Sequence, residues 1–287
     1  MVATYTFRPL LVKLVPKVRL KGLTLAGTIM VLFTVFLAIL APILTPYDPT
    51  KSVDLSLQPP SWKHPFGTNK VGQDMWSRTV YGARTILAVV FLSTIVSIVI
   101  GVPLGLISGY IGGILDRVLA MIMDAMYAFP GLILAIAIAA ALGPGIINTA
   151  ISIAVVYVPT YFRMVRGQTL SIKEQLYVEA ARAIGAKPLT ILTRYVFPNV
   201  VSVIAVVFTL SVADVVLTEA ALSFFGLSVP APTPDWGFDL KAGHPYLLSG
   251  YWWLITFPGL MIMILAVGFT FIGEGVAEYL GAREVKI

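Results

Sequence analysis

Long apolar runs alternate with shorter polar segments along the whole chain. Six runs approach or exceed the roughly 20 residues that a helix needs to cross a bilayer: 23–44, 86–106, 116–141, 146–162, 200–217 and 251–272. Within each run the apolar residues are continuous, whereas the strands of a transmembrane β-barrel alternate apolar and polar positions. The pattern predicts an all-α polytopic membrane protein with six transmembrane helices.

The runs divide the chain into four regions. We expect a cytoplasmic tail at 1–22, a first transmembrane helix with an extracytoplasmic segment at 23–85, a five-span core at 86–272, and a cytoplasmic tail at 273–287. Two interpretations of the first tail remain open, because its leucines at helical spacing fit an amphipathic helix on the inner leaflet. The other is an unstructured segment that only sets topology.

Charge predicts the orientation of these spans. The tail 1–22 carries five Lys and Arg residues without an acid, and residues 163–194 carry six Lys and Arg residues against two acids. Cytoplasmic loops of membrane proteins are enriched in such cations. Six spans then place both termini in the cytoplasm, although five cations in 45–85 would lie outside.

Composition limits the chemistry that the chain can perform. It is 58% hydrophobic and only 12% charged, it has no cysteine, and its net charge of +6 needs no nucleic acid to explain it. No Gly-x-x-x-x-Gly-Lys-Ser/Thr, His-Glu-x-x-His or Gly-x-Ser-x-Gly motif occurs. The two histidines, His64 and His244, are more typical of surface residues than of metal ligands. We therefore expect no enzyme activity, cofactor or metal in this chain.

A charged segment between the fourth and fifth runs predicts two short helices. Ser171 and Glu174 have the spacing of a capping box that would begin the first helix. Tyr177, Ala181 and Ile184 would then form its apolar face.

The same segment contains three helix-ending or helix-starting signals. Gly185 stands where the residue after a helix takes a positive φ, and Pro188 suits the first turn of a second helix. Pro198 is expected to close that helix.

Residues 177–199 also resemble the coupling loop of ABC importer permeases, whose pattern is Glu-Ala-Ala, three residues, Gly, nine residues, Ile-x-Leu-Pro. The matching residues are Glu179, Ala180, Ala181, Gly185 and Pro198, with Tyr195 and Phe197 as apolar departures. The resemblance implies that 167–199 forms the cytoplasmic coupling loop, and that these five matching residues contact an ATPase.

Three further stretches resemble the dipeptide/oligopeptide type of these permeases: 64–84, 124–130 and 219–227. The resemblance implies a MetI-like core with an additional N-terminal span, in the inner membrane of a prokaryote. It further implies a second homologous permease subunit, two cytoplasmic ATPases that carry ATP and Mg²⁺, and an extracytoplasmic solute-binding protein.

Acidic residues inside apolar runs are candidate functional groups. Asp124 and Asp214 lie within spans, Pro130 is expected to kink the third span, and Glu219 lies at the outer end of the fifth. An ionised group in hydrocarbon costs at least about 2.5–3.5 kcal/mol, so it usually faces a cavity or a partner. Two interpretations remain open: Asp124, Pro130 and Asp214 line the solute path, or the two aspartates are satisfied locally, Asp214 by Ser211 and Thr218. For Glu219 we expect a structural role.

Several functions stay open at this stage. The resemblance favours an ATP-driven importer of di- or oligopeptides, with oligosaccharides or nickel as alternative solutes. An ion-coupled secondary transporter that uses Asp124 and Asp214, or a membrane scaffold, would belong to different classes.

Overall fold

A computed structural model describes residues 22–284, with the side chains of 22–280. Apart from an isolated bridge between Thr68 and Asp74, the regular structure of these residues is helical. The elements are α1 (Gly22–Leu44), α2 (Met75–Ile111), α3 (Gly113–Tyr127), α4 (Gly131–Leu142), α5 (Ile146–Lys173), α6 (Leu176–Ala183), α7 (Pro188–Ile191), the π-helical turn η2 (Leu192–Val196), α8 (Phe197–Phe225), α9 (Trp236–Gly243), the 3₁₀ helix η3 (His244–Ser249) and α10 (Trp253–Glu284).

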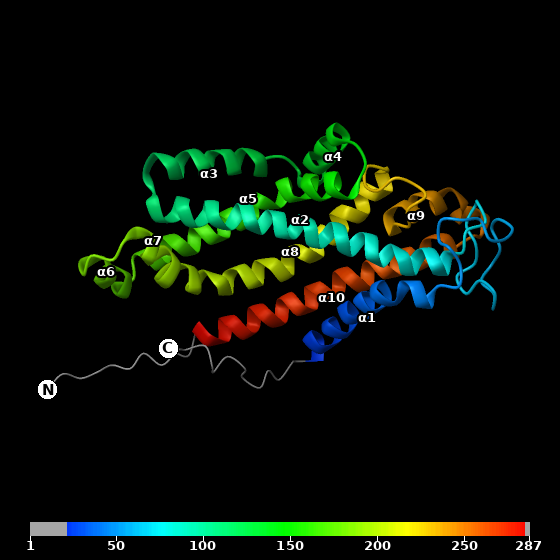
Figure 1. Ribbon diagram of the computed structural model, residues 1–287, viewed down its shortest axis with the longest axis horizontal. Coiled ribbons are helices and arrows are strands. Elements are labelled where there is room, and N and C mark those ends of the chain that lie inside the picture. Colours follow the sequence, from blue (N-terminus) through cyan, green and yellow to red (C-terminus); the bar gives the residue numbers. More distant parts are fainter. Residues whose placement is uncertain (1–21, 285–287) are drawn as a thin grey trace.

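The long helices lie roughly along one axis and leave a different set of short elements at each end (Figure 1). Helices α6 and α7 lie at one end, called here the α6 end. Helix α9 and the loop 45–74 lie at the opposite end, called here the α9 end. The predicted N-terminal amphipathic stretch falls outside the described residues.

Six membrane spans are found when one bent helix pair is taken as a single span. Five helical segments are long and apolar enough to cross a membrane: α1, α2, α5, the continuous segment Pro188–Phe225 and α10. Helices α3 and α4 together pass the same test, but they meet at an angle of 91°. The all-α, six-span prediction is therefore confirmed, and the kink expected at Pro130 is a complete break.

The helices extend further than the apolar runs that predicted them. Helix α2 begins at Met75, eleven residues before the predicted second span, because Asp74 caps it by accepting a hydrogen bond from the Ser77 N–H. Helix α5 continues to Lys173 beyond the predicted end at 162. Hydropathy marks the part of a helix that lies in lipid, and it carries no information about where a helix ends in water.

Helices α2 and α5 pack closely along a stripe of glycines. Gly101, Gly105 and Gly109 recur every four residues on one face of α2. A Cβ atom at Gly105 would lie 2.7 Å from the main-chain oxygen of Phe162, and one at Gly109 would lie 2.9 Å from that of Arg166. The absence of side chains lets the two backbones approach, which is the common way of packing helices in membranes.

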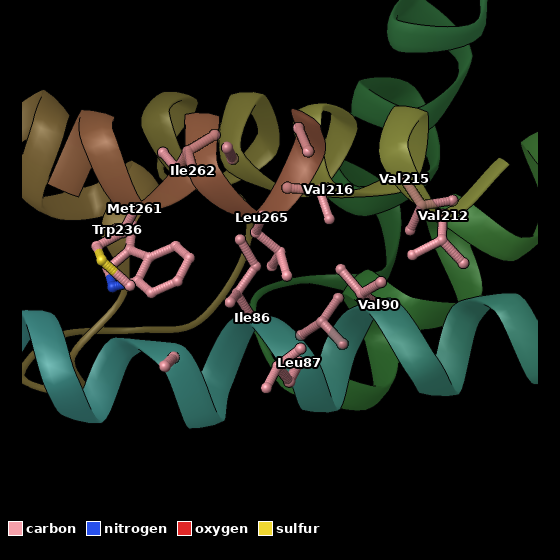
Figure 2. Close-up of a cluster of buried hydrophobic side chains, with 14 of the residues drawn as sticks. Ile86, Leu87, Val90, Val212, Val215, Val216, Trp236, Met261, Ile262 and Leu265 are labelled. Atoms are coloured by element: carbon pink, nitrogen blue, oxygen red, sulfur yellow. The ribbon is translucent and has the colours of Figure 1, made fainter. Parts of the chain in front are cut away.

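A second packing centre lies where α2, α8, α9 and α10 meet (Figure 2). Ile86 of α2, Val216 of α8 and Leu265 of α10 are all fully buried there. Trp236 of α9 closes this cluster, and its indole Nε1 donates a hydrogen bond to the main-chain oxygen of Thr79 (2.7 Å). Gly82 leaves room for that indole ring. Helix α9 is thus fixed to the membrane helices.

The segment after the fifth apolar run begins as a helix and then folds back onto the membrane helices. Helix α8 does not stop at residue 217; it continues to Phe225 and ends at Gly226, which has a φ of 83°. The chain then returns through Pro230–Pro234 to α9, whose Trp236, Gly237 and Asp239 are buried. The segment is therefore a helix end followed by a packed return, as its apolar composition requires.

Candidate functional site: the coupling helices and the broken third span

Helix α6 does not start at the predicted capping box. Ser171 lies inside α5, and Glu174 is the residue that follows the last turn of α5. Helix α6 starts after Gln175, which makes no side-chain capping bond. The prediction of a capping box was wrong because α5 continues through that sequence, and only Glu174 and Gln175 separate the two helices.

The end of α6 has the predicted glycine turn. Gly185 adopts a φ of 83°, and its N–H donates to the main-chain oxygen of Arg182 (3.0 Å). The N–H of Ala186 donates to the oxygen of Ala181 (3.0 Å), which completes a Schellman motif. Pro188 begins α7 in its first turn, as predicted.

The buried face of α6 differs from the predicted one. Val178 is buried in a cluster with residues of α2, α5 and α8, and Ala181 is buried too, whereas Tyr177 and Ile184 are exposed. The prediction gave one apolar face made of Tyr177, Ala181 and Ile184, and of these three only Ala181 is buried. A docking helix can instead expose apolar residues, so periodicity alone does not separate its two faces.

The exposed side of the α6–α7 pair combines apolar residues with one carboxylate. The side chains of Leu176, Ile184 and Leu189 are 81%, 84% and 72% exposed. Glu179 and Ala180 are exposed on the same helix as Ala181, which is buried. Of the residues implied by the resemblance, Glu179, Ala180 and Gly185 are therefore accessible, and Ala181 is buried.

Pro198 does not close a helix. It lies in the first turn of α8, and the helical path from Pro188 to Phe225 is continuous. A proline inside a helix removes one hydrogen bond and crowds the preceding turn. The π turn η2 widens the backbone there, with the N–H of Phe197 bonded to the oxygen of Leu192. Because of this wider turn, the helix continues through Pro198 without a break.

A cavity of about 370 Å³ lies at the break between α3 and α4. Pro130 stands between the two helices, and the cavity is lined on its other side by α5. The lining residues are Met126, Tyr127, Phe129, Pro130, Gly131, Val156, Tyr157 and Thr160. The predicted residue Pro130 is thus part of a hollow that two aromatic hydroxyls and one threonine make partly polar.

Asp124 has a charged partner that the sequence alone did not indicate. Its carboxylate accepts a hydrogen bond from Arg163 Nη2 at 2.8 Å, and the guanidinium also lies 4.3 Å from the centre of the Tyr127 ring. The Arg163 and Asp124 side chains are 52% and 66% exposed. This pair lies one turn away from Tyr127 and Thr160, which line the cavity.

Asp214 lies on the exposed side of α8, and its carboxylate does not form the bonds to Ser211 and Thr218 that one of the two open interpretations required. Thr218 donates instead to the main-chain oxygen of Asp214 (2.9 Å). The Thr218 hydroxyl also shares a hydrogen bond with that of Tyr157 (3.0 Å), and Tyr157 lines the cavity. The turn of α8 that carries Asp214 is therefore connected to the cavity wall.

His64 is buried, so its placement at the surface was wrong. Its Nδ1 lies 2.8 Å from Asp74 Oδ1, and its Nε2 lies 3.3 Å from Asp54 Oδ2. The ring thus joins the loop 45–74 to the cap of α2. Each carboxylate is ten residues away in sequence, which is too far for a local pattern to reveal.

Glu219 is buried near the return to α9. It accepts a hydrogen bond from the Ser228 hydroxyl (3.1 Å), and the neighbouring Asp235 caps α9 by accepting from the Phe238 N–H (3.1 Å). This position fits the structural role expected for Glu219.

Comparison with known proteins places these features in one family. Residues 101–286 match the binding-protein-dependent transport system inner membrane component, and residues 21–60 match the N-terminal transmembrane domain of oligopeptide transport permease C.

Two curated relatives cover most of the chain. The di/tripeptide transport system permease protein DppC of Pseudomonas aeruginosa is 38% identical over 90% of this chain and 88% of that permease. The glutathione transport system permease protein GsiD of Shigella flexneri is 38% identical over 92% of this chain and 88% of that permease.

A solved structure supports the fold. A chain of the MetNI methionine ABC transporter in an inward-facing conformation superposes with a TM-score of 0.58 over 71% of this chain and 96% of that chain, at 23% identity. The additional N-terminal span and the MetI-like core are both accounted for by these matches. The chain belongs to the binding-protein-dependent transport system inner membrane component family and is an ABC importer permease of the dipeptide/oligopeptide type.

Proposed function

We propose that this chain is one of two homologous permease subunits of an importer that moves di- and oligopeptides across the cytoplasmic membrane. An extracytoplasmic binding protein delivers the solute, and two cytoplasmic ATPases drive the transport with ATP and Mg²⁺. The observation that carries the proposal is that relatives matched over about nine-tenths of this chain are named for di/tripeptides and glutathione. The hydrolysis of ATP belongs to the partner subunits.

The α6–α7 pair, which lies at one end of the molecule (Figure 1), is proposed as the surface that docks the ATPase. The side chains of Leu176, Ile184 and Leu189 are exposed there, and Glu179 of α6 adds an exposed carboxylate. Val178 packs α6 against the membrane helices from the other side, where Ala181 is also buried. Because α6 follows α5 after two residues, a push on its exposed face moves a whole span as a rigid body.

The α6 end is proposed to face the cytoplasm. It carries the cation-rich segment 163–194, and the described part of α10 runs towards it. Both termini then lie inside. The chain has no native cysteine, so a Lys187→Cys variant gives a clean measurement. An impermeant thiol reagent added to intact cells should leave this position unlabelled. Labelling from outside would show that the α6 end faces the outside.

The cavity at Pro130 is proposed to belong to the solute path, together with Asp124 and Asp214. Its volume of about 370 Å³ and its tyrosine and threonine hydroxyls suit part of a peptide. A Thr160→Cys variant tests this. A bulky thiol reagent should block uptake there, and solute should slow the labelling. Met263→Cys on the exposed face of α10 is the control, for which labelling should leave uptake unchanged. Equal effects of labelling on uptake at both positions would show that the cavity is not part of the solute path.

Transport by the complete complex tests the proposed solute. The permease pair, the ATPases and the binding protein are reconstituted in vesicles, and uptake of a labelled dipeptide, a labelled oligosaccharide and Ni²⁺ is followed in parallel. We expect uptake of the dipeptide that requires both ATP and the binding protein. Uptake of another solute alone would overturn the peptide assignment, and uptake driven by an ion gradient without ATP would overturn the ABC mechanism.

A further inference from the structure

Helix α3 is separated from its neighbours in the chain by a break in the helix at each end. At its start, Gly112 and Gly113 are consecutive glycines with φ of 71° and 67°. At its end, the 91° break at Ala128–Pro130 separates it from α4. Met123 is the buried residue of α3. The apolar packing of α3 is therefore limited to Met123 and three partly buried neighbours on the same helix.

Two ion pairs attach α3 to α5 instead. Arg166 donates to Asp116 through two atoms, with Nη2 2.7 Å from Oδ2 and Nε bonded to Oδ1. Arg163 donates to Asp124 at 2.8 Å. The bidentate pair is partly buried, and a planar guanidinium held at two oxygens fixes orientation as well as distance.

An apolar contact lies between the two ion pairs. Met123 of α3 packs there against Val158 and Phe162 of α5, and all three are buried. Helix α3 is therefore held to α5 at three successive levels. Asp116 also accepts a hydrogen bond from Ser108 of α2, close to the Gly112 turn, so this contact lies near the point about which α3 would rotate.

Helix α5 connects these attachments to the proposed ATPase surface. Its last residue, Lys173, is separated from α6 by two residues, and Arg166 lies two turns before that end. At its far end, α3 carries Tyr127, which lines the cavity. A displacement of α6 can thus reach the cavity through α5, the ion pairs and α3.

We propose that Asp116–Arg166 and Asp124–Arg163 are the attachments through which α5 moves α3, and that α3 is the moving wall of the cavity at Pro130. This inference rests on the proposed coupling function of α6. Asp116, Asp124, Arg163 and Arg166 are positioning residues in this scheme, since they act by fixing α3.

Distances between spin labels test the mechanical part. Val118 of α3, Met164 of α5 and Met263 of α10 are all exposed and can be replaced by cysteine in pairs. In the full complex, the 118–164 distance should stay constant between ATP-free and ATP-trapped states while the 118–263 distance changes. An equal change in both distances, or no change in either, would overturn the proposal.

Charge variants test the ion pairs. Arg166→Asp should broaden the 118–164 distance distribution and lower uptake at least tenfold while ATP hydrolysis continues. The double variant Asp116→Arg, Arg166→Asp should restore much of the uptake, because it rebuilds the pair with reversed charges. Arg166→Lys, which keeps the charge and loses the bidentate geometry, provides an intermediate readout if the reversed variants assemble poorly.

The control is an ion pair far from α3, and failure of the ion-pair role gives a different result from failure of the solute assignment. Asp48→Asn breaks an exposed Lys51–Asp48 ion pair at the α9 end and should leave distances and uptake unchanged. Unchanged uptake in both Arg166 variants, or no rescue by the reversed pair, would overturn the role of the ion pairs. Intact ATP-driven distance changes without uptake of any peptide would overturn only the assignment of the solute.

Discussion

Arg78 of α2 and Asp239 of α9 form an ion pair whose side chains are 2% and 3% exposed, with Nη2 2.8 Å and Nε 2.9 Å from the same carboxylate oxygen. Arg78 also donates to the main-chain oxygens of Pro49 (3.0 Å) and Pro232 (3.1 Å). Burial raises the pKa of Asp239, and the neighbouring guanidinium opposes that shift. One side chain therefore joins two helices and two loops at the α9 end.

Breaking this pair should destabilise the protein strongly. Asp239→Asn leaves the buried guanidinium of Arg78 without its counter-charge, and losing one partner of a buried pair typically costs about 3–5 kcal/mol. We expect a marked fall in the thermal unfolding temperature of the purified permease in nanodiscs. Asp48→Asn, at the exposed pair with Lys51, should change stability by less than about 1 kcal/mol. Similar effects of the two variants would contradict the role of Arg78 in joining these helices and loops.

The glycine stripe of α2 gives a second prediction. Gly105→Ala places a Cβ 2.7 Å from the oxygen of Phe162, so α2 and α5 must separate. Overpacking of this kind costs about 1–3 kcal/mol. Gly167→Ala is the control on α5, since nothing lies within 4 Å of its Cβ position, and it should be neutral or slightly stabilising. Thermal unfolding of both variants measures the difference; equal stability would show that the close approach is not needed.

The sequence predicted the spans well because apolar length is a local property. It also predicted the turn at Gly185 and a change of helix direction at Pro130, where one residue type determines the backbone geometry, although the expected kink is a complete break. The spacing of Gly101, Gly105 and Gly109 also indicates close helix packing, but the prediction of the spans was based on apolar length alone.

Features that depend on distant residues were not predictable. Arg163 and Asp124 are 39 positions apart, and Arg78 and Asp239 are 161 positions apart. Their pairing follows from the tertiary fold. The apolar face predicted for α6 does not coincide with its buried face for a related reason. Tyr177 and Ile184 fit the helical period that normally marks a core, yet both are exposed.

The loop 45–74 should lose stability in acid through Asp54. The ammonium group of Lys63, the Leu55 N–H and His64 all bind its carboxylate, which lowers its pKa well below the ordinary 3.8. A carboxylate with a lowered folded pKa contributes fully above about pH 4, and the contribution is lost as pH falls through the lowered value. The thermal unfolding temperature of the wild type should therefore decrease when the pH is lowered below about 4.

Asp54→Asn isolates this effect. The variant should be less stable than the wild type at neutral pH, and the difference between the two should shrink as the pH falls. Asp48, whose pKa is lowered to about 2 chiefly by the Thr50 hydroxyl, is present in both chains and cancels in the comparison. A difference that stays constant between pH 2 and pH 6 would show that the Asp54 charge does not hold the loop.

Gly185 provides the most direct test of coupling. Its φ of 83° is strained for any residue with a Cβ, yet no atom lies within 4 Å of the position that a Cβ would take. Gly185→Val therefore adds backbone strain of about 1–2 kcal/mol without a steric clash. The strain acts on the Schellman turn that sets the direction of α7 relative to α6, and six packed spans should tolerate it.

We expect the Gly185→Val permease to reach the membrane at a near-normal level and to bind the ATPase weakly, or to hydrolyse ATP without matching uptake. Gly167→Val is the control, because its site is equally open and its backbone is helical. Glu179→Lys changes the same exposed surface by charge reversal and should give the same loss of coupling. ATP hydrolysis and uptake are measured together in reconstituted vesicles. If Gly185→Val and Glu179→Lys both support normal coupled transport, α6 and α7 are only a connection between spans, because neither their geometry nor their charge would then matter to the ATPase.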